Sequence, residues 1–285
     1  MADDAVKGIG GLAERSRIVI EPSRGWQAFD IKSLWEYREL LGVLILRDIK
    51  VRYSQTVLGA AWVVLQAVAT TGMFTLVFGT LVKIPSEGYP YVVYVFSALL
   101  PWTFFANAVN ASGNSLVNSS GLIGKVYFPR LVIPLASVGA GLIDFCISTV
   151  LLLLLLLVLG AGWSASLLAA PFLLGAVATA ALGVGILLSA LVVSYRDFRH
   201  VIPFLLQVWM FATPVVYPAT LVPERWRWVL HLNPLSGLIG GFRSAFLGSP
   251  FDLPALAVSC AWAVLLFLLG VAYFVKAERR FADII

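Results

Sequence analysis

The chain has 285 residues, of which 60% are hydrophobic and 12% are charged, whereas a soluble globular domain has about 45–50% apolar and about 25% charged residues. This composition excludes an ordinary water-soluble domain. The formal net charge is +5, and because the basic residues lie between apolar runs, they fit a membrane protein better than a nucleic-acid-binding protein. The two cysteines, Cys146 and Cys260, fall within apolar runs and provide no disulfide framework.

Residues 1–32 predict an N-terminal cytoplasmic segment, because they contain no apolar stretch followed by a cleavage site. The next segment, 33–56, predicts a helix, since Ser33 and Glu36 have capping-box spacing. At helical spacing, one face of this segment is polar and the roughly opposite face is apolar. The polar stripe consists of Glu36, Glu39, Arg47 and Lys50. The apolar stripe consists of Leu34, Tyr37, Leu41, Leu44 and Ile45. We interpret this segment as an amphipathic helix in the membrane interface, with a helix packed against protein as the alternative. Val43, Arg38, Asp48 and Arg52 depart from the pattern.

Residues 57–276 contain six apolar runs that predict membrane-spanning helices, since about 20 apolar residues cross the hydrocarbon core of a bilayer. The runs cover approximately 57–82, 90–111, 134–160, 167–194, 201–217 and 254–276. With the N-terminus in the cytoplasm, only four of the 20 Lys and Arg residues fall in outside segments, namely Lys83, Arg225, Arg227 and Arg243. Cytoplasmic segments carry the excess of Lys and Arg, so we expect both termini, including the tail 277–285, in the cytoplasm. The predicted fold class is an all-α polytopic membrane protein with six transmembrane helices.

Two connections carry further patterns. The inside loop 112–133 starts rich in Ser, Asn and Gly and becomes basic and aromatic before Pro129, which suits a short helix that docks on a cytoplasmic partner; a flexible connection is the alternative. The outside segment 218–250 has two short patterned stretches on either side of the breaker Asn233-Pro234. Both are too short to span, so we expect short external helices that re-enter or lie on the outer surface.

No motif predicts an enzyme. The stretch GLIGK at 121–125 lacks the glycine spacing and the Ser or Thr of a phosphate loop. His200 and His231 have no recognisable partners, so we predict no catalytic residue, no metal and no cofactor in this chain. Asp144 is the single acid within the predicted spans. It is a candidate ion-coupling group, but the small-residue pattern at 139–144 favours an interhelical hydrogen-bonding role.

Four segments, in this order and spacing, resemble the permease subunits of type-2 ABC transporters that export lipid-linked polysaccharides such as O-antigen, capsule and teichoic acid. They are RDIKVRYSQTVLGAAW at 47–62, KVYFPRLVIPLA at 125–136, SYRDF at 194–198 with QVWMFATPVVYP at 207–218, and NPLSGLIGGFR at 233–243. The resemblance covers about residues 30–280. One departure is Ala67 after Gln66, where many relatives have proline.

This resemblance implies a permease of the bacterial inner membrane that forms a homodimer and binds two copies of a separate ABC ATPase subunit, which would hold ATP and Mg. The substrate would be an undecaprenyl-diphosphate-linked polysaccharide, with O-antigen as the first candidate. Membrane lipids are further expected partners, and nucleic acid is not. An ion-coupled secondary transporter is the alternative function, although the two halves show no internal repeat; a membrane glycosyltransferase would need clustered acids.

The resemblance also implies roles for particular segments. A turn at Leu58-Gly59 would join the interface helix to the first span. The loop 112–133 would couple to the ATPase, and its contact residues are predicted to be Lys125, Tyr127, Phe128 and Arg130. Basic residues before the first span are candidates for binding the lipid diphosphate, with ordinary positive-inside charge as the alternative; they are Arg47, Lys50 and Arg52.

Amides can bind sugar hydroxyls and aromatic rings can bind apolar sugar faces, so both residue types in the first and fifth spans predict a polymer path: Trp62, Gln66, Phe74, Gln207, Trp209, Phe211 and Tyr217. Packing or lipid contact is the alternative for each aromatic. The segment 218–250 is predicted to form an external gate, with an aromatic-anchored surface loop as the alternative; its candidate residues are Trp226, Trp228, Asn233, Pro234, Gly237 and Gly241. We expect Gly237, Gly240 and Gly241 to pack against the second copy.

Overall fold

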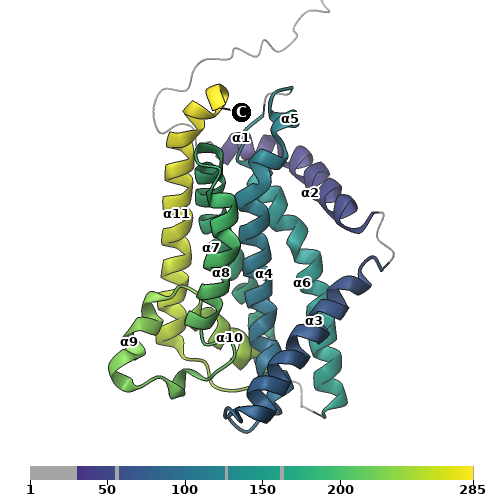
Figure 1. The fold of residues 1–285 in the computed structure, drawn as a ribbon, viewed down its shortest axis with the longest axis vertical. Helices are drawn as coiled ribbons and strands as arrows, with labels where there is room; N and C mark the ends of the chain where they lie inside the picture. The colour runs from purple at the N-terminus through teal and green to yellow at the C-terminus, as the bar shows by residue number, and fades with distance from the viewer. Residues whose placement is uncertain (1–30, 55–57, 126–127, 161–163, 285) are drawn as a thin grey trace, which may run out of the picture. The chain divides into compact units, whose positions relative to one another are not determined.

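The computed structural model describes residues 31–54, 58–125, 128–160 and 164–284, and side chains between residues 34 and 278 of these ranges. Within them the fold is all-α (Figure 1). In chain order the helices are α1 (Ile31–Glu36), α2 (Arg38–Tyr53), α3 (Ala61–Phe74), the π-helical η2 (Thr75–Leu81), α4 (Tyr91–Asn118), α5 (Ser120–Ile123), α6 (Val132–Val158), the 3₁₀ turn η3 (Ala165–Ala169), α7 (Ala170–Ser194), α8 (Phe198–Ala212), the 3₁₀ turn η4 (Ala219–Leu221), α9 (Glu224–Leu232), α10 (Ser236–Leu247) and α11 (Leu253–Ile284).

Five helical segments in the described part of the chain are long and apolar enough to cross a membrane: Ala61–Leu81, Tyr91–Asn118, Val132–Val158, Ala165–Ser194 and Leu253–Glu278. The prediction of an all-α polytopic membrane protein is therefore confirmed. The fifth predicted run gives the shorter apolar helix α8 of 15 residues, which is about 22 Å long and falls short of a bilayer core of about 30 Å. It ends before Pro214, which has no backbone N–H with which to continue the helix.

The buried core is formed mainly by α4, α7 and α10, and α11 packs against α7. Two glycines let α7 and α11 cross at backbone contact: a Cβ atom placed on Gly183 would lie 2.4 Å from the Phe267 backbone nitrogen, and one on Gly270 would lie 2.2 Å from the Gly183 carbonyl oxygen. A side chain of any size at either position would force the helices apart. Gly185 of α7 similarly receives Ser112 of α4, where a Cβ would lie 2.6 Å from the serine side chain. Small residues thus set the helix spacing of the core.

The helix α2 packs against α6, with Leu44 buried and Ile45 seated over Gly139. The predicted polar stripe stays outside, since Glu39 and Lys50 are exposed. The interpretation as a helix packed against protein therefore holds for one face of α2. The other face leaves Val43, Leu46 and Val51 exposed, as a helix at a lipid interface would.

The first span is peripheral. Only 6% of its most apolar window is buried, against 78% for α4. It begins after a turn at Gly59, whose φ of +49° is a left-handed conformation that glycine adopts without strain. The helix runs regularly through Gln66 and Ala67 and widens into the π-helical η2 only from Thr75. At Ala67, where many relatives have proline, the helix of this chain is therefore regular.

The connections lie at two ends. The short helices α1, α2 and α5 lie at the same end as the C-terminal part of α11, and α9 and α10 lie at the opposite end (Figure 1). The structure extends α4 through Ser112–Asn118, so the connection predicted as loop 112–133 is reduced to residues 119–131, which include α5. At the other end, α10 is buried against α4, α7 and α11, whereas α9 is mostly exposed.

Candidate functional site

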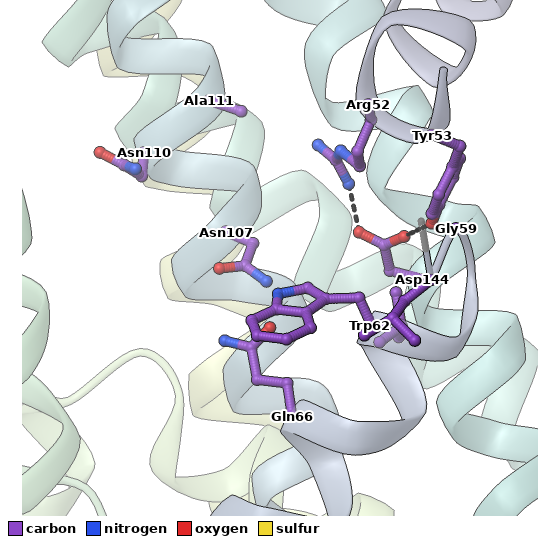
Figure 2. Close-up of a pocket in the computed structure, with 11 residues that line it drawn as sticks. Arg52, Tyr53, Gly59, Trp62, Gln66, Asn107, Asn110, Ala111 and Asp144 are labelled. Carbon is purple, nitrogen blue, oxygen red and sulfur yellow. Dashed lines mark hydrogen bonds and ion pairs between the residues drawn. The ribbon is translucent and has the colours of Figure 1, made fainter. Parts of the chain in front are cut away.

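A cavity of about 540 Å³ opens between the end of α2, the start of α3, and the facing sides of α4 and α6 (Figure 2). It is lined by Arg52, Tyr53, Leu58, Gly59, Trp62, Val63, Gln66, Asn107, Asn110, Ala111 and Asp144. The wall therefore combines one guanidinium, one carboxylate, three amides and an indole ring. A neighbouring cavity of about 210 Å³ shares Gln66, Asn107 and Asp144 and continues among apolar side chains of α4 and α6.

Local structure explains how these side chains converge. The end of α2 and the start of α3 meet at the same cavity, and α3 begins just after the left-handed turn at Gly59. On α3, Trp62 and Gln66 are four residues apart and share one helix face. On α4, Asn107 and Asn110 are three residues apart, and both line the cavity. Polar residues of two spans, α3 and α4, thus line one cavity.

The charged centre of this cavity is the Asp144 carboxylate. Its two oxygens accept hydrogen bonds from the Arg52 guanidinium and the Tyr53 hydroxyl at the end of α2 (Figure 2). Burial, and next the hydrogen bond to Asp144, raise the pKa of Tyr53 from 10.0 to about 12, so the hydroxyl stays a donor at neutral pH. The predicted hydrogen-bonding role of Asp144 is confirmed, and its partner is the interface helix rather than another span.

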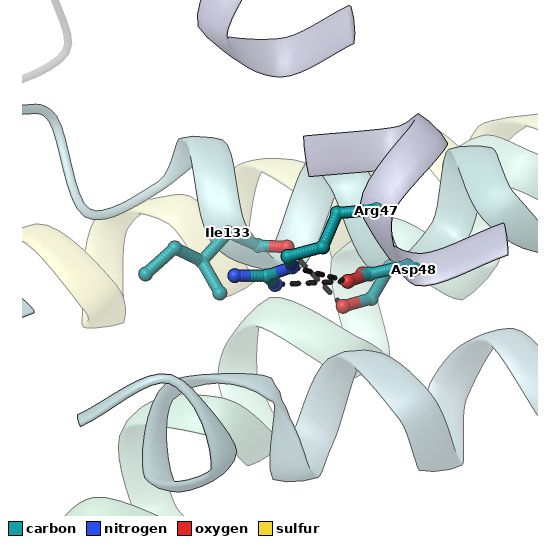
Figure 3. A network of polar contacts seen from close by, with 4 residues as sticks. Arg47, Asp48 and Ile133 are labelled. Atoms are coloured by element: carbon teal, nitrogen blue, oxygen red, sulfur yellow. Dashed lines mark hydrogen bonds and ion pairs between the residues drawn. The ribbon is translucent and has the colours of Figure 1, made fainter. Parts of the chain in front are cut away.

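The three predicted lipid-diphosphate cations separate in the structure. Arg52 alone lines the cavity. Arg47 pairs with the neighbouring Asp48, with Nη2 2.8 Å and Nε 3.0 Å from Oδ1 (Figure 3). Lys50 is exposed and forms no ion pair within the described residues. Arg47 and Lys50 share the polar stripe of α2, whereas Arg52 lies on another side of the helix, so the three cations do not form one cluster.

The predicted polymer-path residues also fall into groups. Trp62 and Gln66 line the cavity. Gln207 and Phe211 are exposed on α8. The others make contacts within the chain: Phe74 stacks on Phe78, and the Tyr217 hydroxyl donates to the Phe211 carbonyl at 3.1 Å.

Trp209 packs within the chain, and its path role stays a prediction. Its ring meets Phe105 edge to face, with centroids 5.3 Å apart, and its Nε1 donates to the Asn233 side chain at 3.0 Å. The Asn233 amide in turn donates to the Thr213 hydroxyl at 2.8 Å. The predicted breaker Asn233 thus fastens the outer segment to the end of α8.

The predicted ATPase-contact residues differ in accessibility. Lys125 is exposed, and Tyr127 lies outside the described residues. Phe128 is 5% exposed, so its ring anchors the loop in the core and offers no contact surface. Arg130 donates to the Glu278 carbonyl oxygen of α11 at 3.1 Å. The accessible part of this connection is therefore its first half, with α5 and Lys125.

The expectation that the glycines of α10 pack against a second copy of the chain is wrong for Gly237 and Gly241. Gly237 faces α11 of its own chain, where a Cβ would lie 2.1 Å from the Ala255 carbonyl oxygen, and Gly241 faces Leu173 and Leu256. Neither can pack against a second copy, because both are buried within the chain. Gly240 has no atom near its Cβ position. Of the other gate candidates, Pro234 is buried, and Trp226 and Trp228 are exposed on α9; the gate itself stays a prediction.

Arg243 is a residue that the sequence analysis counted only as an outside charge. It is 7% exposed and its guanidinium donates to the Pro214 and Val215 carbonyl oxygens at 3.1 and 3.0 Å, with the Tyr94 ring centroid 3.8 Å away. Burial lowers the pKa of Arg243. The signal in the sequence was an arginine within a short apolar stretch, which requires a buried acceptor.

Comparison with known proteins agrees with this architecture. The family model described as ABC-2 type transporter matches residues 39–247. An O-antigen export system permease protein RfbA from Klebsiella pneumoniae is 27% identical, covering 87% of this chain and 95% of that protein. The protein of the same name from Myxococcus xanthus is 30% identical, covering 89% and 98%. The polysialic acid transport protein KpsM from Escherichia coli is 23% identical, covering 72% and 80%.

These matches confirm the resemblance noted from the sequence and the prediction that the chain is a permease rather than an enzyme. The matched region includes every residue that lines the 540 Å³ cavity. It extends from the interface helix to the end of α10. The chain belongs to the ABC-2 type transporter family, as a multi-pass membrane permease subunit without an ATPase domain of its own.

Proposed function

We propose that this chain is the membrane subunit of an ATP-driven exporter that moves undecaprenyl-diphosphate-linked polysaccharide, with O-antigen as the substrate, across the bacterial inner membrane. Relatives named as O-antigen export permeases match it over nearly their whole length. The relative named for polysialic acid transport is less similar, which makes a capsule polymer the second candidate.

The observation that carries this proposal is the cavity at the α2–α3 turn. A lipid-linked saccharide has an anionic diphosphate next to a neutral, hydroxyl-rich sugar. The cavity offers the Arg52 guanidinium beside the amides of Gln66 and Asn107 and the ring face of Trp62. A guanidinium binds phosphate oxygens in a bidentate manner, and amides bind hydroxyls. The mixture fits the junction between the diphosphate and its first sugar.

A second copy and two ATPase subunits complete the proposed exporter. The first span leaves most of its surface uncovered, and Gln207 and Phe211 are exposed on α8, so these two helices are the candidates to face a second copy and enclose a path. In this arrangement α8 with residues 213–217 serves as the fifth span in chain order and brings the total to six. The ends of the chain, α5 and Lys125 then lie on the cytoplasmic side, where the ATPase would bind.

The first test is complementation. In a strain that lacks its own O-antigen permease, the chain expressed with its partner ATPase should restore surface polysaccharide, and an ATPase that cannot hydrolyse ATP should abolish the effect. Export that continues without ATP hydrolysis but stops when the proton gradient is dissipated would refute the proposal in favour of an ion-coupled carrier.

The second test addresses the path. In a variant whose native cysteines, Cys146 and Cys260, are replaced by alanine, single cysteines at positions 66 and 207 should react with a water-borne thiol reagent. A cysteine at Leu154, which is exposed on α6 outside both cavities, is the matched control for a lipid-facing site and should stay protected. Full protection of positions 66 and 207 in an exporting complex would refute a path along α3 and α8.

A further inference from the structure

The cluster at the cavity mouth already contains an anion that belongs to the protein. Both oxygens of Asp144 are engaged by the last two residues of α2, Arg52 and Tyr53. The side chains of Arg52 and Asp144 are 34% and 18% exposed, so the pair borders the cavity and is accessible from it. Figure 2 shows the carboxylate and the guanidinium at one side of the space, opposite the amides of Asn107 and Gln66.

The donors that hold Asp144 are also those that a phosphate group would use. A guanidinium and a phenolic hydroxyl can donate to two oxygens of a phosphate as they do to two oxygens of a carboxylate. Among the described residues that line the cavity, Arg52 is the single cation. A diphosphate bound there would meet a guanidinium whose charge is already compensated, and it would lie close to a carboxylate of the same sign.

We propose that Asp144 is a built-in competitor for the diphosphate of the lipid-linked substrate: it occupies Arg52 and Tyr53 while the cavity is empty, and an incoming diphosphate displaces it from them. This inference rests on the proposed function and adds a regulatory role for the α6 carboxylate. The exchange frees the end of α2 from α6. Because Arg52 and Tyr53 of α2 and Trp62 and Gln66 of the first span line the same cavity, substrate loading at the end of α2 also acts on the first span.

The exchange leaves the fold intact, because α2 has a second attachment to α6. Ile45 contacts Gly139, where a Cβ would lie only 2.8 Å from its Cδ1 atom, and Leu44 is buried nearby. Removing the Asp144 charge therefore alters the cavity mouth without removing the apolar contact. This makes substitutions at Asp144 usable in a binding experiment.

The experiment measures the affinity of the permease–ATPase complex in lipid nanodiscs for farnesyl diphosphate, a short prenyl diphosphate. Asp144→Asn should bind about fivefold more tightly, the size expected from one half-exposed ion pair. Arg52→Gln should bind about tenfold more weakly, since it removes a charge-assisted donor. The double variant should bind as weakly as Arg52→Gln. Tyr53→Phe, which removes a single hydroxyl, should bind about threefold more weakly.

The matched control is Asp48→Asn. It removes the same charge from the same region, but Asp48 pairs with Arg47, and neither lines the cavity. Its affinity for farnesyl diphosphate should equal that of the parent chain. An equal gain in Asp48→Asn and Asp144→Asn would show a general charge effect and overturn the proposal.

Four further results decide between the exchange and its alternatives. Unchanged or weaker binding of farnesyl diphosphate by an Asp144→Asn variant with a native melting temperature would overturn the exchange. A gain in affinity for inorganic diphosphate, with no gain for farnesyl diphosphate, would also overturn it and would assign the cluster to free diphosphate. Unchanged affinity in a chain that does restore polysaccharide export overturns the exchange alone. A gain in affinity in a chain that restores no export supports the exchange and refutes the O-antigen function.

Discussion

Gly237 and Gly240 lie three residues apart on α10, and the structure predicts opposite effects when each becomes alanine. A Cβ on Gly237 would lie 2.1 Å from the carbonyl oxygen and 2.5 Å from the carbonyl carbon of Ala255, whereas nothing lies within 4 Å of a Cβ on Gly240. The obstacle at Gly237 is backbone of α11 and cannot rotate away. The alanine can be accommodated only if α10 moves away from α11.

The magnitude follows from three contributions. Overpacking of this kind costs about 1–3 kcal/mol, and the hydrogen bond from the Gly237 N–H to the Ser259 hydroxyl, now 3.0 Å long, would lose about 1 kcal/mol. Alanine returns about 1 kcal/mol through its greater helix propensity. Gly237→Ala should therefore lower the free energy of unfolding by about 1–3 kcal/mol, and Gly240→Ala should raise it by up to about 1 kcal/mol.

The assay is unfolding of the purified chain in mixed micelles by titration with a denaturing detergent, followed by circular dichroism. Each variant is compared with the parent chain under identical lipid conditions. Equal stabilities for Gly237→Ala and Gly240→Ala would refute the contact between α10 and α11. A more stable Gly237→Ala would favour the earlier expectation that this glycine faces an open surface or a second copy.

Three further outcomes are expected in the same assay. Gly59→Ala should destabilise the chain by about 1 kcal/mol through its left-handed backbone alone, because no atom lies within 4 Å of the added methyl group; an unchanged stability would refute the turn. Arg243→Met should lower the free energy of unfolding by about 2–4 kcal/mol, because it leaves two buried carbonyls without a donor. Tyr94→Phe should be neutral or stabilising, since the Tyr94 hydroxyl has no partner among the described residues. A large loss of stability in Tyr94→Phe would contradict this. The pKa of Tyr53 is raised from 10.0 to about 12, so its stabilising contribution is complete below about pH 10 and is lost as the pH rises towards 12; Tyr53→Phe should remove this alkaline loss, and an identical pH profile would refute the shift.

The ion pair at the cavity shows how far the sequence could lead. Arg52 departs from the polar stripe of its helix, and Asp144 is an acid in an apolar span. Each residue by itself indicates that a partner of opposite charge is needed. Since 91 residues separate Tyr53 and Asp144, helical periodicity, which is a local signal, could not show that these residues meet.

The end of α4 illustrates a different difficulty. Residues 112–118 are rich in Ser, Asn and Gly, which favour turns over helix interiors, and the sequence therefore predicted a loop. The structure continues the helix because this stretch is buried: Ser112 fits against Gly185, and Leu116 has no exposed surface. Packing against α7 outweighs the local preference.

Aromatic residues and glycines at membrane depth were the least predictable. Trp209 and Trp62 have the same chemistry, yet one packs on Phe105 and binds Asn233 while the other lines a cavity. Likewise, glycines on one face of a helix indicate that another helix packs closely against that face. They do not show whether that second helix belongs to the same chain. For Gly237 the neighbour is α11, which follows immediately in the sequence.

The crossing of α7 and α11 through Gly183 and Gly270 has a consequence for the synthesis of this protein. The ribosome synthesises α11 after α7, so α7 enters the membrane with its small-residue face uncovered until α11 follows. A translation product that stops before Gly270 would contain α4 and α7 but would lack the backbone surface that closes over Gly183 of α7. Such a product would leave the Gly183 face of α7 open to lipid, and it would lack the contact that sets the distance between α7 and α11.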